Sequence, residues 1–100
     1  MEFSIKSEIV PHSEPKRFTE GGRLFRNVRI YLAVENESDL DKVQSVQYEL
    51  HPTFRQRYQV SVDRRTNFEI RIWTYGFFNI QAKVSLNDGT VKTVTGFVKW

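Results

Sequence analysis

The stretch FNIQAKVSLNDGT, residues 78–90, carries the longest regular pattern in the sequence. Its apolar residues occupy every second position: Phe78, Ile80, Ala82, Val84 and Leu86. A period of two predicts a half-buried β-strand. Asn87-Asp88-Gly89 follows directly, and this sequence is typical of a hairpin turn because Asn and Gly tolerate a positive φ. We therefore expect a strand that reverses at residues 87–89 and pairs with the next one.

Six other segments show a similar pattern of apolar residues. They cover residues 3–9, 28–34, 46–50, 58–62, 68–72 and 91–100. Tyr58, Val60 and Val62 form the apolar side of the fourth of these. In the last one the apolar residues change parity, which predicts a β-bulge near Thr95-Gly96. Seven short strands separated by turns predict an all-β, immunoglobulin-like antiparallel β-sandwich of seven to eight strands.

Two segments depart from this strand pattern. SDLDKV, residues 38–43, hints at one short helical turn that Ser38 would cap. Residues 11–22 are polar and contain two prolines and two glycines, so they predict a long loop. With 100 residues and no repeat, we expect a single domain over residues 1–100.

Composition excludes several classes of function. The sequence has no cysteine, which rules out disulfides, thiol catalysis and cysteine-ligated zinc. It has no apolar run of the ~20 residues that a membrane helix needs, and its start does not resemble a signal peptide. These features predict a cytoplasmic protein and no membrane insertion by this chain.

The charges are unevenly distributed along the chain. Residues 1–50 contain seven Lys or Arg and nine Asp or Glu, a net charge of −2, whereas residues 51–100 contain eight and three, a net charge of +5. The basic residues of the second half include Arg55, Arg57, Arg64 and Arg65. Such a group could steer an anionic partner, and Phe54 and Tyr58 flank the first two of these arginines as stacking platforms would. With an acidic cluster at residues 35–41 and a net charge of only +3, we expect nucleic-acid binding to be unlikely.

The sequence offers little that could support catalysis. His12 and His51 are the only histidines, and no acid is placed to orient either imidazole. There is no HExxH motif and no glycine-rich phosphate loop. We therefore expect no enzyme activity, no metal site and no cofactor.

Two aromatic loops remain to be explained. YELHPTF, residues 48–54, begins as a strand and ends in His51, Thr53 and Phe54. WTYGFFNI, residues 73–80, places Tyr75 at a turn that Gly76 permits. Phe54 either caps the core, with His51 merely ending a strand, or these side chains form one wall of a pocket whose second wall is the other loop.

Three motifs resemble the YEATS domain, most closely its prokaryotic branch. They are LHPTF (residues 50–54), TYGFFNI (residues 74–80) and KVSLNDGT (residues 83–90). The resemblance extends over residues 24–100. Two positions depart from the family pattern: Thr74 stands where a glycine is common, and Phe77 stands where a charged residue is common.

The resemblance implies a recognition module that reads acylated lysine in an aromatic channel between two loops. Phe54 and Tyr75 would sandwich the planar acyl-amide. Thr53 would donate a hydrogen bond to the acyl carbonyl, and the backbone N–H of Tyr75, beside Gly76, would add another. A hydrogen-bonded amide held between rings is physically reasonable, because an unpaired buried carbonyl costs ~1–3 kcal/mol.

The resemblance also implies roles for three further residues and a range of partners. His51 would support the wall, Phe78 would close the base, and Phe25 is the nearest candidate for another aromatic. The partner would be an acylated peptide or a small acyl ligand, or else a partner protein or a fused signalling or membrane domain. The alternative is an immunoglobulin-like scaffold for protein–protein interaction without a small-ligand pocket.

Overall fold

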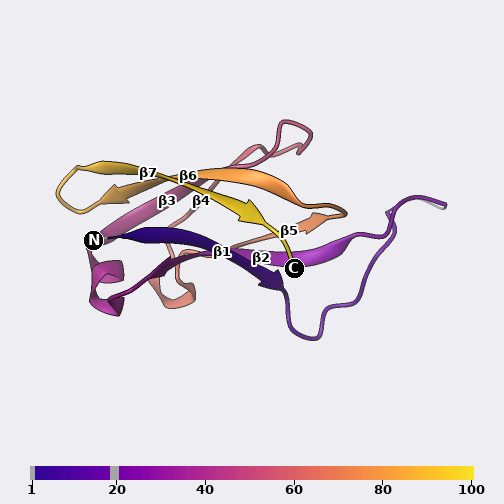
Figure 1. Ribbon diagram of the computed structural model, residues 1–100, viewed down its shortest axis with the longest axis horizontal. Helices are drawn as coiled ribbons and strands as arrows, with labels where there is room; N and C mark the ends of the chain where they lie inside the picture. Colours follow the sequence, from indigo (N-terminus) through magenta and orange to yellow (C-terminus); the bar gives the residue numbers. More distant parts are fainter. Residues whose placement is uncertain (1, 19–20) are drawn as a thin grey trace.

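Seven strands, in the part of the chain that the structure describes, form two antiparallel sheets. The structure is a computed structural model that describes residues 2–18 and 21–100. The strands are β1 (Phe3–Ile9), β2 (Arg26–Val34), β3 (Val43–Glu49), β4 (Tyr58–Ser61), β5 (Ile70–Thr74), β6 (Phe78–Leu86) and β7 (Val91–Val98). One sheet has the order β1-β2-β5 and the other the order β4-β3-β6-β7 (Figure 1). The predicted immunoglobulin-like β-sandwich is confirmed.

The core lies between the sheets and is built from the alternating residues of the inner strands. Every second residue of β6, from Phe78 to Leu86, is buried, as the sequence predicted. Val28, Ile30 and Leu32 of β2 face them from the other sheet and are fully buried. The turn after β6 is the predicted hairpin: Gly89 has φ 88°, and its N–H donates to the carbonyl of Leu86 at 3.0 Å.

The apolar residues of β4 face solvent. Tyr58, Val60 and Val62 are 55%, 61% and 71% exposed, whereas Ser61 is buried. The register explains this outcome, because Ser61 pairs with the buried Val46 of β3 and residues paired directly across a sheet share a face. The expectation that the apolar side of this strand lies in the core is therefore wrong.

The bulge predicted near Thr95-Gly96 is also wrong. β6 and β7 pair without a register shift from Phe78 and Val98 to Ser85 and Val91. The parity of the apolar residues changes because Val91 and Phe97 point to solvent. Gly96 has a different purpose: a Cβ built there would lie 2.9 Å from the Cβ of Ile5. The glycine lets β1 and β7 approach closely where the two sheets meet.

The helical hint became a 3₁₀ helix, η1 (Glu37–Lys42), but with a different cap. The Oδ1 of Asn36, rather than Ser38, caps it by accepting hydrogen bonds from the Ser38 N–H at 3.3 Å and hydroxyl at 2.9 Å. A second 3₁₀ turn, η2 (Arg64–Thr66), joins β4 to β5. The long loop before β2 is tied down by paired backbone hydrogen bonds between Lys16 and Phe25 at 2.7 and 2.8 Å. Among the described residues, no helix has the length and apolarity that crossing a membrane requires.

One buried side chain links the two sheets. Tyr48 of β3 is fully buried, and its hydroxyl donates to the carbonyl of Phe68 at 2.7 Å. Phe68 precedes β5 and, like Asn67, has a positive φ, of 57° and 59° respectively. This backbone conformation is uncommon for a phenylalanine. The hydrogen bond from the Tyr48 hydroxyl therefore holds the segment in a conformation that few other interactions would favour. Burial raises the pKa of Tyr48 well above its usual range.

The strand directions bring three loops to one end of the sandwich. Arg26, at the start of β2, pairs with Thr74, at the end of β5. Glu49, at the end of β3, pairs with Gln81 near the start of β6. The loop after β3, the turn between β5 and β6 and the segment before β2 therefore share this end, and η1 lies at the other (Figure 1).

Gly96→Ala should destabilise the domain by about 1–3 kcal/mol, because the new methyl group overlaps the β-carbon of Ile5 and cannot be relieved by a rotamer change. Gly76→Ala is the matched control, since a Cβ there meets no atom within 4 Å. Urea unfolding of both variants checks this. Equal stabilities of the two would show that β1 and β7 do not need the glycine.

Tyr48→Phe should cost about 1–2 kcal/mol at neutral pH, because it leaves the buried carbonyl of Phe68 without its donor. Folding raises the pKa of Tyr48, so its contribution is complete below the ordinary value of about 10 and is lost as pH rises above it. The stability difference between the wild type and the variant should therefore shrink above pH ~10. A difference independent of pH in denaturant titrations would contradict the buried, neutral hydroxyl.

Candidate functional site

The three loops at one end of the sandwich enclose a cavity of about 460 Å³, which we call the aromatic cavity. All seven residues that the sequence singled out line it: Phe25, His51, Thr53, Phe54, Tyr75, Gly76 and Phe78. Arg55, Trp73, Thr74 and Phe77 complete the lining. The residues are thus brought together, while their role toward a ligand stays a prediction.

The first wall is the loop after β3. The N–H of Phe54 donates to the carbonyl of His51 at 3.0 Å, which makes a tight turn. The N–H of Leu50 donates to the carbonyl of Arg57 at 2.6 Å and closes the loop. The ring of Phe54 packs on the ring of Phe78 at a centroid distance of 5.1 Å. Because Phe78 is a core residue, the first wall rests directly on the core.

His51 and Thr53 form a polar pair within this wall. The N–H of Thr53 donates to Nδ1 of His51 at 3.2 Å, and the hydroxyl of Thr53 lies 2.9 Å from the same nitrogen. A backbone N–H only donates, so Nδ1 is the acceptor and carries no hydrogen. The threonine hydroxyl therefore donates to His51 and keeps its lone pairs for a further donor.

The second wall is the turn between β5 and β6. Thr74 is buried, and its hydroxyl donates to the carbonyl of Gly76 at 3.1 Å and accepts from the N–H of Gly76 at 3.4 Å. The threonine that stands where glycine is common in the resembled family therefore braces the turn. A Cβ at Gly76 would meet no atom within 4 Å, which leaves the space beside this residue open.

Tyr75 projects from this turn and is 51% exposed. Its ring meets that of Phe25 edge-on at 5.1 Å, and the guanidinium carbon of Arg23 lies 4.7 Å from its centroid. Among the described residues, the rings of Phe54 and Tyr75 make no stacking contact, although both line the aromatic cavity. Each ring packs against a different aromatic partner, Phe54 on Phe78 and Tyr75 on Phe25.

Four lining residues were missed as site residues. Trp73 lies on the outward-facing side of β5 and meets Phe18 at 5.7 Å. Phe77 is exposed and packs on Trp100 at 4.8 Å. The signal for Trp73 was available, because it shares the parity of Arg71 rather than that of Ile70 and Ile72. Arg55 and Thr74 follow only from the way the loops fold.

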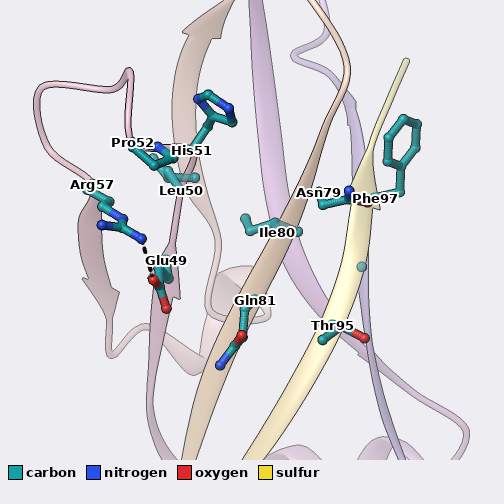
Figure 2. A pocket seen from close by; sticks show the side chains of 11 residues that line it. Glu49, Leu50, His51, Pro52, Arg57, Asn79, Ile80, Gln81, Thr95 and Phe97 are labelled. Carbon is teal, nitrogen blue, oxygen red and sulfur yellow. Dashed lines mark hydrogen bonds and ion pairs between the residues drawn. The ribbon is translucent and has the colours of Figure 1, made fainter.

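A larger and shallower hollow of about 650 Å³ lies beside the aromatic cavity on the outer face of the four-stranded sheet (Figure 2). Gln81 and Thr95 lie along it, and the ion pair of Arg57 with Glu49, 2.9 Å long, forms one flank. His51 lines both hollows. We take the aromatic cavity as the candidate site, because it has aromatic side chains on both walls and the sheet-face hollow does not.

The four arginines that are close in sequence do not form one patch. Arg57 pairs with Glu49, Arg64 with Asp41 at 2.9 Å, and Arg65 with Asp63 at 3.5 Å. Of these arginines only Arg55 lines the aromatic cavity. Within residues 2–18 and 21–100, no three His, Asp or Glu side chains gather as a metal site would need.

Comparisons with known proteins agree with the fold. The family model of the prokaryotic YEATS domain matches residues 26–97. A solved structure of the Yaf9 YEATS domain recognizing an H3K122suc peptide superposes with a TM-score of 0.62 at 16% sequence identity, covering 96% of this chain and 67% of that chain. At this identity the likeness shows the fold alone. No curated protein matches the chain.

The stability costs of Tyr75→Ala and Phe78→Ala should distinguish a ring on the cavity wall from a ring in the core. Tyr75 is half exposed, so its truncation should cost less than ~1 kcal/mol of unfolding free energy. Phe78 is only 9% exposed, so its truncation should cost about 3–5 kcal/mol. Chemical denaturation measures both. If Tyr75→Ala unfolds the domain, the ring is structural and the second wall is not a free surface.

Proposed function

The chain belongs to the prokaryotic YEATS family, and from that membership we propose that it is a non-catalytic recognition module that binds an acylated lysine side chain in the aromatic cavity. Eukaryotic members of the family read acylated lysine, and YEATS domains are reader modules rather than enzymes. The observation that carries the proposal is the pairing, in one cavity, of a threonine hydroxyl oriented by histidine with aromatic rings on two separate loops.

The cavity suits a neutral, flat ligand. An acylated lysine has no charge on its amide and presents two flat faces. Phe54 and Tyr75 would cover these faces, and ring contacts of this kind contribute by buried area and dispersion. Both rings already pack against other side chains, so binding would not have to order them first.

The hydrogen bonds around Thr53 support one orientation of the ligand's amide. Because the Thr53 hydroxyl donates to His51, its free lone pairs suit the amide N–H of an acylated lysine rather than the carbonyl. The carbonyl then needs a separate donor, and the backbone N–H of Tyr75 makes no hydrogen bond to another described residue. In this proposal Thr53 accepts from the amide N–H, in place of the donation to the carbonyl that the resemblance implies. This arrangement satisfies both polar groups of the ligand, which a buried amide requires.

A protein-interaction scaffold is the second candidate, and β4 favours it. This strand lies at the edge of its sheet and exposes Tyr58, Val60 and Val62. An exposed apolar edge is a surface on which another chain can add a strand. Ligand mapping separates the candidates, because a scaffold would show its shifts along β4 and not in the two loops.

The test is an NMR titration with acetylated and crotonylated lysine peptides. We expect shifts in the loop at residues 51–54 and the turn at residues 75–77. Tyr75→Ala should abolish binding, and Thr53→Val should weaken it by roughly 1–2 kcal/mol because the amide N–H loses its acceptor. Thr93→Val, on the exposed side of β7, is the matched control and should bind as the wild type does. A folded domain in which no acylated peptide shifts any loop resonance at millimolar concentration would refute the proposal.

A further inference from the structure

Three cationic side chains lie near the aromatic cavity. Arg55 lines the cavity and is exposed. The guanidinium carbon of Arg23 lies 4.7 Å from the ring of Tyr75, and the ammonium of Lys16 lies 5.8 Å from the ring of Trp73. Both distances lie within the range of a cation–π contact, which is ~6 Å. Two of the three charges are therefore held against rings that themselves line the cavity.

These three cations form no ion pair with a described Asp or Glu, which is also true of Arg17, Arg26 and several surface lysines. Elsewhere in the structure most arginines pair with a carboxylate: Arg29, Arg57, Arg64, Arg65 and Arg71. No Asp or Glu is among the described residues that line the cavity. Glu20 lies outside the described residues. Nothing that the structure describes at the mouth neutralises the three positive charges.

The acidic cluster of residues 35–41 lies at the opposite end of the sandwich, whereas Glu49, at the cavity end, is paired with Arg57. Glu37, Asp39 and Asp41 lie on η1, which follows the end of β2, whereas the start of β2 adjoins the cavity (Figure 1). The domain therefore carries three unpaired cations near the cavity, and at the other end three η1 carboxylates that share two cations, Arg64 and Lys42. A field of this kind attracts an anionic segment to the mouth and repels a basic one.

We propose that the lysine bound in the cavity is flanked by Asp or Glu residues, so that the partner is an acidic protein segment. The inference rests on the proposed function. It adds a preference for the residues on either side of the acylated lysine. The lysine side chain holds its backbone outside the cavity, where neighbouring carboxylates come within reach of Arg55, Arg23 and Lys16. A tail rich in lysine and arginine meets like charges at the same place and binds more weakly.

The experiment compares acetyl-lysine peptides with acidic, neutral and basic flanks, measured by NMR titration at low and high salt. With two or three exposed ion pairs, the acidic peptide should bind roughly tenfold tighter than the neutral one at low salt. The advantage should shrink at high salt, because exposed pairs are screened. Arg55→Glu should remove most of it, whereas Lys83→Glu, which makes the same charge change on β6 away from the cavity lining, should not.

Four results would overturn the inference, and one of them also ends the proposed function. Equal binding of the three peptides leaves acyl-lysine recognition intact and removes the preference for acidic flanks. An unmodified acidic peptide or an oligonucleotide that binds as tightly as the acidic acetylated peptide shows that the cations act apart from the cavity. If a succinyl-lysine peptide with neutral flanks gains as much affinity over the neutral acetyl-lysine peptide as the acidic peptide does, the cations bind a carboxylate on the acyl group rather than one on a flanking residue. Absence of binding by every peptide refutes both proposals together.

Discussion

The hydrogen bond from the Tyr48 hydroxyl to the Phe68 carbonyl joins the two sheets inside the core, and the site depends on how those sheets are set against each other. Tyr48 lies on β3, which continues into the first wall of the cavity. Phe68 leads into β5, which continues into the second wall. The N–H of Leu32 also donates to the carbonyl of Asn67 at 2.9 Å, so the segment before β5 is fixed from both sheets. A shift between the sheets would change the spacing of the walls.

The rings of Phe54 and Tyr75, one on each wall of the cavity, pack against different side chains. Phe54 rests on Phe78, whereas Tyr75 rests on Phe25 and on the turn braced by Thr74. A preformed cavity of this kind spares a ligand the cost of ordering the rings. The same division means that mutations in one wall should leave the other in place.

The structure separates arginines that are neighbours in sequence into those that pair with carboxylates and one that lines the cavity. Arg57, Arg64 and Arg65 are neutralised by carboxylates near them. Arg55, from the same run of sequence, is left at the cavity. Six of the twelve other basic residues pair with described carboxylates, whereas the three cations near the cavity do not and remain available to a partner. Exposed ion pairs contribute little to stability in any case.

The sequence by itself determined the sandwich, the hairpin at residues 87–89 and seven of the eleven residues that line the cavity. Alternation along β6 and the Asn-Asp-Gly turn are local signals, and local backbone preference decides them. Only the tertiary structure decided which face of β4 is buried, why Gly96 is a glycine, which arginine reaches the cavity and that Asn36 caps η1. Register across a sheet, close approach of two strands and ion pairing all join residues that are distant in sequence, and a pattern read along one chain does not contain these distances.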